Sequence, residues 1–217
     1  MQDERRAGFH FHKWKTRNNE SVSGPGSTLR ATYALRQFLP GIFQQYQVVD
    51  FLDAPCGDFN WMKAVDLSAV NYHGLDIVEE IIAHDRETHG SDKVRFDVAD
   101  ICKDPLPKAD MMMCRECLFH LRYVDILEFF RNFARSEIPL LLTTSDGVKQ
   151  NADIPEPGGF RMINLRRAPF FLPEPLAKFP DWRLNSPPGK RRLRYMCLWN
   201  RGQVAKAAAR MEAALED

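Results

Sequence analysis

The stretch that decides the fold is Val48-Val49-Asp50-Phe51-Leu52-Asp53-Ala54-Pro55-Cys56-Gly57, a short apolar run that ends in an acid and a turn. Apolar runs of this length with a turn signal behind them are typical of buried strands. A turn with glycine lets backbone N–H groups approach a ligand closely, and a helix N-terminus behind it adds further donors. The sequence therefore predicts a buried strand that leads into a ligand-binding loop.

Around this strand, segments typical of strands and helices alternate. Further strands are predicted at residues 72–76, 93–98, 109–114 and 138–144, and helices at residues 28–39, 59–66, 78–87 and 124–136. This alternation favours a parallel sheet with right-handed crossovers. After residue 150 the pattern changes to a Pro- and Gly-rich segment, two close strands at residues 181–185 and 193–199, and a helix at residues 206–215. We therefore expect an α/β sheet of about seven strands with a terminal hairpin.

The overall charge is small but unevenly distributed. The chain has 217 residues with 30 Lys and Arg and 29 Asp and Glu, and this balance argues against a general nucleic-acid binder. Hydrophobic residues make up 44%, which argues against disorder of the whole chain. Residues 50–100 hold 12 acidic and 4 basic side chains, whereas residues 151–217 hold 7 acidic and 12 basic ones.

Neither a membrane span nor a metal site is indicated. No apolar run approaches the roughly 18 residues of a membrane span, and residues 1–6 lack the apolar region of a signal peptide. The five cysteines are odd in number and lie in apolar runs, which is typical of buried thiols in a reducing compartment. Cys114-x-x-Cys117 has no second ligand pair at metal spacing, so we expect no metal and a cytoplasmic location.

Three acids follow three neighbouring predicted strands. Asp53 ends the first strand, Asp76 lies 23 residues later, and Asp100 follows the third strand. Because the carboxyl ends of parallel strands meet at one edge of the sheet, these acids converge on one crevice, where an acid at this spacing accepts hydrogen bonds from ribose hydroxyls. The loop has no G-x-G-x-x-G pattern, and an acid such as Asp58 would repel a pyrophosphate. A positively charged sulfonium nucleoside without phosphate is compatible with these acids.

The stretch Phe51-Leu52-Asp53-Ala54-Pro55-Cys56-Gly57-Asp58-Phe59-Asn60-Trp61 resembles the first motif of class I S-adenosylmethionine-dependent methyltransferases, in particular a subgroup whose loop reads DAPCGDFNWM. Further stretches that resemble this subgroup are Ser23-Gly24-Pro25-Gly26-Ser27-Thr28, Leu106-Pro107-Lys108-Ala109-Asp110, Cys114-Arg115-Glu116-Cys117-Leu118-Phe119-His120-Leu121 and Pro169-Phe170-Phe171-Leu172-Pro173-Glu174-Pro175. The resemblance covers about residues 20–200. It implies a Rossmann-like, seven-stranded, mostly parallel sheet with a C-terminal antiparallel hairpin and helices on both faces.

The resemblance also implies a layout and a cofactor. It implies one methyltransferase domain over residues 1–217, with an N-terminal lid and helix (1–47), a cofactor-binding core (48–146), an acceptor-side insert (147–178), a terminal β-hairpin (179–200) and a C-terminal helix (201–217). The cofactor is S-adenosylmethionine and the product S-adenosylhomocysteine. The implied cofactor-binding residues are Arg30, Asp53, Ala54, Pro55, Gly57, Asp58, Asp76, Ile77, Asp100, Ile101 and Arg115.

Three residues are candidates for acid–base work on the acceptor. His120, Glu116 and Asp146 follow the fourth and fifth strands, where a base for a hydroxyl acceptor belongs. Two of them also have a structural interpretation: His120 as a packing histidine, and Glu116 as an acid that stabilises a helix N-terminus. In the insert, Arg161 and Asn164 are the candidate acceptor-binding residues, with a solvated surface loop as the alternative.

The leading hypothesis is methyl transfer to a small-molecule acceptor, namely a sugar, a polysaccharide precursor or a secondary metabolite. If the basic segments, including Lys190-Arg191-Arg192-Leu193-Arg194, meet above the crevice, an anionic acceptor is favoured. The alternatives are a protein or peptide N-methyltransferase, a nicotinamide-dependent oxidoreductase and a non-catalytic binding domain. The sequence leaves open the acceptor, the methylated element and the oligomeric state.

Overall fold

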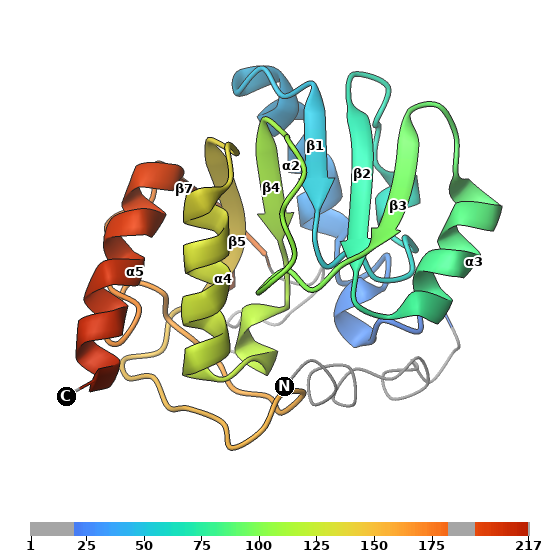
Figure 1. Ribbon diagram of the computed structural model, residues 1–217. Coiled ribbons are helices and arrows are strands. Elements are labelled where there is room, and N and C mark those ends of the chain that lie inside the picture. The colour runs from blue at the N-terminus through green and yellow to red at the C-terminus, as the bar shows by residue number, and fades with distance from the viewer. Residues whose placement is uncertain (1–19, 182–193, 217) are drawn as a thin grey trace.

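A single mixed sheet forms the centre of the protein, for which a computed structural model describes residues 20–181 and 194–216 (Figure 1). The strands are β1 (Asp50–Asp53), β2 (Asn71–Asp76), β3 (Val94–Val98), β4 (Met111–Cys114), β5 (Leu140–Asp146), β6 (Ala177–Pro180) and β7 (Arg194–Asn200). Their order is β3-β2-β1-β4-β5-β7-β6. Strands β1 to β5 are parallel, and β7 runs antiparallel to both β5 and β6. The predicted seven-stranded, mostly parallel α/β sheet is confirmed.

Helices cover both faces of this sheet. They are α2 (Tyr33–Gln45), α3 (Glu79–His89), α4 (Tyr123–Arg135) and α5 (Arg201–Glu216). In Figure 1, α4 and α5 lie in front of the sheet and α2 lies behind it. Short 3-10 turns stand at η1 (Pro25–Ser27), η2 (Met62–Ala64) and η3 (Leu118–His120). Among these described helices, none is long and apolar enough to cross a membrane.

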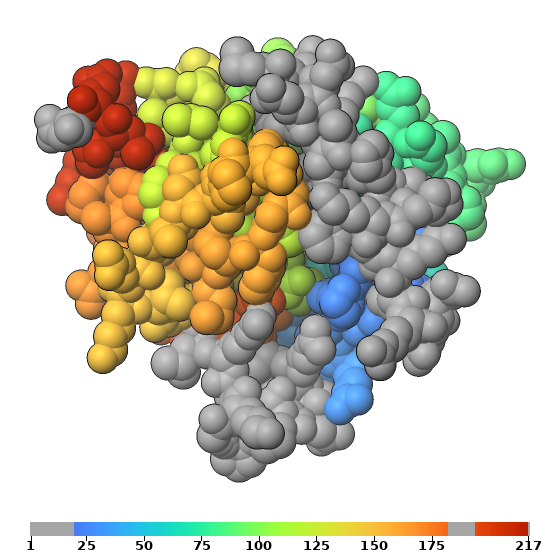
Figure 2. Space-filling view, turned by 90° about the horizontal axis from the view of Figure 1, so that it is seen from below, coloured from blue at the N-terminus to red at the C-terminus, as the bar shows by residue number. Residues whose placement is uncertain are grey.

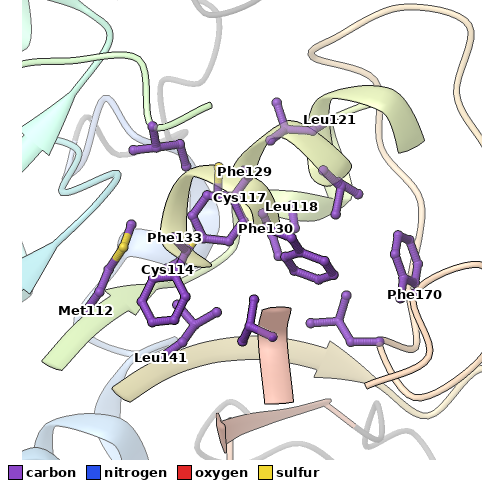
Figure 3. Packing of buried hydrophobic residues seen from close by; sticks show 14 of the residues in the cluster. Met112, Cys114, Cys117, Leu118, Leu121, Phe129, Phe130, Phe133, Leu141 and Phe170 are labelled. Atoms are coloured by element: carbon purple, nitrogen blue, oxygen red, sulfur yellow. The ribbon is translucent and has the colours of Figure 1, made fainter. Parts of the chain in front are cut away.

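The strand residues alternate between two hydrophobic cores because successive side chains of a strand point to opposite faces. Leu52 of β1 packs in the core beneath α4 and α5, whereas its neighbour Phe51 packs in the core with α2, and both are buried. Figure 3 shows Phe129, Phe130 and Phe133 of α4 gathered in the first core. A parallel sheet buried on both faces holds its strand ends rigidly, which positions the loops that follow.

The structure changes some predicted boundaries. The helix predicted at residues 59–66 is wrong: only the turn η2 forms, because Phe59 adopts a left-handed φ of 52° and Val65 is already extended. The helix predicted at residues 28–39 begins only at Tyr33, after turns in which the Thr28 hydroxyl accepts a hydrogen bond from the Ala31 N–H. The first hairpin strand is β6, four residues before the predicted start. Residues 182–193, with most of the predicted strand, and residues 1–19 of the predicted lid lie outside the described residues.

Candidate active site

A cavity of about 410 Å³ lies where the carboxyl ends of β1, β2, β3 and β4 meet. Besides the loops after these strands, its walls include residues 22–27, Phe160 and Arg194. We call residues 21–27 the strap and residues 147–178 the insert. Figure 2 views the molecule from this end, with the strap in blue and the insert in yellow and orange. The sequence-predicted residues that line the cavity are Asp53, Pro55, Gly57, Asp76, Ile77, Asp100, Ile101, Arg115, Glu116 and His120.

The turn after β1 needs glycine at residue 57. Gly57 has a φ of 60°, and a Cβ placed on it would lie 2.4 Å from the Ser23 hydroxyl oxygen of the strap. Its N–H donates a hydrogen bond to the Asp76 carboxylate at 3.0 Å. A side chain at this position would therefore both strain the backbone and push the strap away.

Asp76 at the end of β2 presents a buried carboxylate to the cavity. Its two oxygens accept hydrogen bonds from the Gly57 N–H and the Val78 N–H, each at 3.0 Å. Burial raises the pKa of Asp76, and these backbone donors oppose the rise. Each carboxylate oxygen has a second lone pair, so Asp76 retains acceptor capacity for two neighbouring ribose hydroxyls.

The wall beside Asp76 is apolar and suits a planar base. Ile77, Val78, Ile81, Ile101 and Leu121 line this part of the cavity. Asp100 also lines the cavity, and its carboxylate accepts a hydrogen bond from the Cys102 N–H at 3.0 Å. Apolar side chains together with the carboxylates of Asp76 and Asp100 match an adenine ring with its ribose, so these residues fit the nucleoside part of S-adenosylmethionine.

Asp53 at the end of β1 is almost wholly buried, at 1% exposure. The Tyr72 hydroxyl donates a hydrogen bond to Asp53 Oδ2 at 2.9 Å. Burial raises the pKa of Asp53 to about 8, although the Tyr72 hydrogen bond and the positive charge of Arg115 lower it. A cation in the cavity favours the ionised carboxylate, so Asp53 fits the positively charged methionine part of the cofactor.

The strap is fastened to the loop after β1 through Asp58. The Asp58 carboxylate accepts hydrogen bonds from the Ser21 hydroxyl at 3.1 Å and from the Val22 N–H at 2.7 Å. In return, the Asp58 N–H donates to the Ser23 hydroxyl oxygen at 2.8 Å. Asp58 does not line the cavity, so its position assigns it to holding the strap and not to direct contact with the cofactor.

Arg115 joins the strap to the strand ends. Its guanidinium donates to the Gly26 carbonyl at 3.0 Å and to the Asp181 carboxylate at 3.2 Å, and it lies over the Trp61 ring. Its buried Nε has no hydrogen-bond partner in the described structure. Since a buried donor without a partner is costly, this N–H fits a missing acceptor such as the carboxylate of the cofactor.

Glu116 lines the cavity and has a strained backbone. Its φ is 50°, a conformation that non-glycine residues rarely adopt, and its N–H donates to the Thr144 hydroxyl at 2.9 Å. Its carboxylate accepts a short hydrogen bond from Arg194 of β7. The same guanidinium reaches the Asp146 carboxylate at 3.3 Å. Asp146 is buried and does not line the cavity, so it orients Arg194.

His120 lies in the cavity wall after η3. His120 Nδ1 is 2.5 Å from the Gly159 carbonyl oxygen, which can only accept a hydrogen bond. This contact places the proton on Nδ1 and leaves Nε2 as the basic nitrogen of the neutral ring. The imidazole packs against the Phe119 and Phe160 rings, with centroids 4.6 and 6.0 Å away.

Several other predicted site residues do not reach the cavity. Arg30 is exposed in the turns before α2, and Ala54 is buried in the core with its N–H bonded to the Met113 carbonyl. Asn164 donates to the Val148 carbonyl at 2.9 Å within the insert. The Arg161 guanidinium donates to the Ala152 and Leu118 carbonyls. Both polar side chains are therefore hydrogen-bonded to backbone carbonyls, Asn164 within the insert and Arg161 within the insert and at the turn after β4.

Sequence reasoning missed several residues of the cavity. Trp61 lies in the quoted motif but was not predicted as a site residue. Phe119 and Phe160 were missed because their side chains have no polar group. Arg194 lies in the basic run after residue 189. The sequence signal that could have identified it is its position at the start of a predicted strand, two residues before the apolar part of β7. The four residues line the cavity together. All five cysteines are buried thiols, and the described residues contain no cluster of ligands suited to a metal ion.

A family model described as a methyltransferase domain matches residues 52–139, which run from β1 to the start of β5. None of the curated proteins matches the sequence. Among solved structures, a SAM-dependent methyltransferase from Leishmania major is 14% identical with a TM-score of 0.57, over 77% of this chain and 70% of that one. PigF with SAH is 12% identical with a TM-score of 0.54, over 78% of this chain and 55% of that one.

Human N-acetylserotonin methyltransferase in complex with SAM is 16% identical with a TM-score of 0.44, over 66% of this chain and 47% of that one. The chain therefore spans about half the length of that human protein. At these identities the structural likeness establishes the fold alone. The match of residues 52–139 to the methyltransferase-domain model indicates that the protein is a methyltransferase.

Proposed function

Because the chain carries the methyltransferase domain and fold of the class I S-adenosylmethionine-dependent methyltransferases, we propose that it methylates a hydroxyl oxygen of a small-molecule acceptor. The observation that carries this proposal is His120, whose tautomer is fixed by Gly159 in the cavity wall. An imidazole with a basic Nε2 can take the proton of a hydroxyl group as its oxygen is methylated.

The residues around the cavity divide the binding of the cofactor between them. With S-adenosylmethionine bound, Asp76 would accept hydrogen bonds from the ribose hydroxyls, Ile77 and Ile101 would enclose the adenine, and Arg115 would bind the methionine carboxylate; all four residues line the cavity. When bound, S-adenosylmethionine supplies a methyl group activated by the sulfonium, and the sulfur keeps the electron pair of the broken bond. The acceptor proton passes to His120 Nε2, so the charges balance.

The protein mainly supplies orientation, since the methyl group is already activated. Glu116 and Arg194 close one side of the acceptor end, and Phe119 and His120 form the adjoining wall. The volume of about 410 Å³ lies in the range of small-molecule sites. This size supports a small acceptor over a protein or peptide substrate.

Arg115 and Arg194 are the arginines among the described residues that line the cavity, and each forms ion pairs with carboxylates of Glu116, Asp146 or Asp181. Arg115 Nε and one terminal nitrogen of Arg194 nevertheless have no hydrogen-bond partner among the described residues, so both side chains can still donate to an anionic group. In the basic run that suggested an anionic acceptor, residues 190–193 lie outside the described residues.

Label transfer tests this function. The purified protein is incubated with S-adenosylmethionine labelled on its methyl group, together with either the low-molecular-mass fraction or the protein fraction of a cell extract. We expect label in the small-molecule fraction, and less of it with the His120→Asn variant. Label in protein instead would support the alternative, a protein or peptide N-methyltransferase.

A further inference from the structure

Two buried donors in the cavity wall have no hydrogen-bond partner. Among the described residues that line the cavity, the buried side-chain nitrogen and oxygen atoms without a partner are Arg115 Nε and Arg194 Nη2. Both belong to guanidinium groups, which stay positively charged and can only donate hydrogen bonds. Because a buried donor without a partner is costly, each nitrogen fits an acceptor atom of a bound molecule. The methionine carboxylate of the cofactor fits Arg115, which leaves Arg194 for a second negatively charged group.

Three contacts fix the direction of the Arg194 guanidinium, which is buried with the residue at 8% exposure. Its Nη1 donates to the Glu116 carboxylate and its Nε to Asp146 Oδ1 at 3.3 Å. Its Cζ lies 5.0 Å from the centroid of the Phe119 ring. Asp146 is itself anchored to the insert, because its Oδ2 accepts a hydrogen bond from the Ile163 N–H at 3.2 Å. A donor held in this way loses little conformational freedom when it binds a ligand.

The Glu116 carboxylate connects the guanidinium groups of Arg194 and Arg115. Its Oε1 accepts a hydrogen bond from Arg194 Nη1 and another, at 3.4 Å, from Arg115 Nη2. The bridging position between the two arginines is therefore already occupied by a carboxylate of the protein. Arg115 also reaches the Gly26 carbonyl of the strap. Arg115 thus belongs to the strap side of the cavity, and Arg194 can serve a different group.

Arg194 lies close to the base of the proposed reaction. The Phe119 ring, which the Arg194 guanidinium covers, also contacts the His120 ring, with centroids 4.6 Å apart. All three side chains line the cavity. A small molecule with a hydroxyl group at His120 could therefore place a second group at Arg194.

We propose that Arg194 binds a carboxylate of the acceptor, which is therefore a small hydroxy acid. This inference rests on the proposed function: the hydroxyl oxygen receives the methyl group, and the carboxylate stays unmethylated, so the product keeps its negative charge. A hydrogen bond from a guanidinium to a carboxylate is stronger than one to a neutral oxygen. A phosphate group carries nearly two charges, so the neighbouring carboxylates of Glu116 and Asp146 would repel it more than they repel a carboxylate.

Label transfer followed by separation on charge tests this class of acceptor. The protein is incubated with methyl-labelled S-adenosylmethionine and the low-molecular-mass fraction of a cell extract, and the remaining cofactor is removed on a cation exchanger. The products are then passed over an anion exchanger at neutral pH and again at about pH 2, where carboxylates with pKa values of about 3–4 lose their charge. A phosphate monoester keeps a negative charge there. We expect label to be retained at neutral pH and not at about pH 2.

Variants of Arg194 connect this retention to the proposed contact. Arg194→Gln removes the cation, but it also leaves the carboxylates of Glu116 and Asp146 without it, which can prevent folding. The double variant Arg194→Gln with Asp146→Asn removes one charge of each sign and leaves the net charge of the cluster unchanged. Arg95→Gln, at an exposed arginine of β3 that does not line the cavity, is the matched control.

The acceptor that gives the retained product is purified, and its KM is measured with each variant. The KM should rise roughly 10- to 100-fold in Arg194→Gln and in the double variant, because a hydrogen bond between charged groups is lost, while kcat changes less. Arg95→Gln should behave like the parent protein. Calorimetry should show unchanged affinity for S-adenosylmethionine in all variants that fold, since Arg115 binds the cofactor carboxylate.

Four results would overturn the inference: label in a neutral product, retention that persists at about pH 2, an unchanged KM in the double variant, or a loss of cofactor affinity that assigns Arg194 to the cofactor. If the label reaches a neutral molecule as a stable ether, only this inference fails. Release of the label as methanol by alkali would reveal a methyl ester, which contradicts the proposed hydroxyl transfer as well. If no small molecule is labelled, the proposed function fails with the inference.

Discussion

The Tyr72 hydroxyl donates a hydrogen bond to the Asp53 carboxyl at 2.9 Å, deep in the sheet where β1 and β2 pair. Burial raises the pKa of Asp53 to about 8, and the Tyr72 bond lowers it. Near neutral pH the carboxyl therefore retains a proton in the absence of ligand. A positively charged ligand in the cavity favours the ionised form and expels that proton.

Affinity for S-adenosylmethionine should consequently rise with pH and level off above about pH 8, since binding releases a proton from Asp53. Calorimetry from pH 6 to 9, in two buffers with different ionisation enthalpies, measures both the affinity and the proton. Tyr72→Phe removes the donor and should move the profile to higher pH. A flat profile with no proton release would show that Asp53 is already ionised in the free protein.

His120→Asn separates catalysis from binding. Asparagine can keep the hydrogen bond to the Gly159 carbonyl but has no basic nitrogen in place of Nε2. We expect kcat to fall by roughly 100- to 10,000-fold with little change in cofactor affinity, as is usual for loss of a general base. The matched control is His84→Asn, an exposed histidine of α3. Equal activity of both variants would make His120 a packing residue.

Alanine should strain the backbone at Gly57, should displace the Glu116 side chain at Gly26, and should be tolerated at a glycine of α2. A Cβ on Gly57 would combine a φ of 60° with a contact of 2.4 Å to Ser23, and a Cβ on Gly26 would lie 1.6 Å from the Glu116 carboxylate. Gly57→Ala should lower the free energy of unfolding by about 1–2 kcal/mol or more, and both variants should weaken cofactor binding.

The control for these variants is Gly41→Ala, where a Cβ meets nothing within 4 Å. Because Gly41 lies inside α2, alanine should raise the free energy of unfolding by about 0.5–1 kcal/mol. Chemical denaturation measures all three variants. A stable Gly57→Ala protein with unchanged cofactor affinity would show that the strap need not lie against this loop.

The buried Asp85 of α3 should make the stability of the folded protein depend on pH. It is fully buried, and neither of its carboxyl oxygens has a hydrogen-bond partner in the described structure. Burial, with Asp58 and Asp76 nearby, raises its pKa from 3.8 to about 8. Between these values the folded protein holds a proton that the unfolded chain has released, so this group lowers stability as pH rises from about 4 to 8.

Asp85→Asn removes that proton linkage. Its melting temperature should exceed that of the parent protein at pH 8 by a few degrees, as a stability change near 1 kcal/mol produces. The difference should shrink towards pH 4, and Asp92→Asn on the surface should show no such trend. A lower melting temperature of Asp85→Asn at pH 8 would reveal a stabilising role for the charged form.

The fold and the cofactor end of the cavity were largely predictable from the sequence. Strand periodicity is local, and Asp53, Asp76 and Asp100 each stand at the end of their own strand, so their convergence follows from parallel pairing alone. The positions that line the cavity as predicted, such as Gly57 and Ile101, lie within a few residues of those strand ends. The positions at these strand ends could therefore be predicted from short stretches of sequence.

The part of the cavity that we propose for the acceptor depends on contacts between distant segments, which the sequence does not display. Arg194 meets Glu116 only because β7 inserts beside β5, and the insert packs on the turn after β4. Arg161 and Asn164 were predicted to bind the acceptor because they are polar, but the backbone of the insert engages them. The apolar Phe160, which directly precedes Arg161 in the sequence, lines the cavity instead.

The central claim is that the cavity binds S-adenosylmethionine through Asp76, and calorimetric titration tests it most directly. Loss of hydrogen bonds to a charged carboxylate should weaken binding roughly 10- to 100-fold in Asp76→Ala and less in Asp76→Asn, which keeps one oxygen. Asp92→Ala, an exposed acid near β3, should bind like the parent protein. Absence of saturable binding to the parent protein, or equal affinity of Asp76→Ala and Asp92→Ala, would contradict this account.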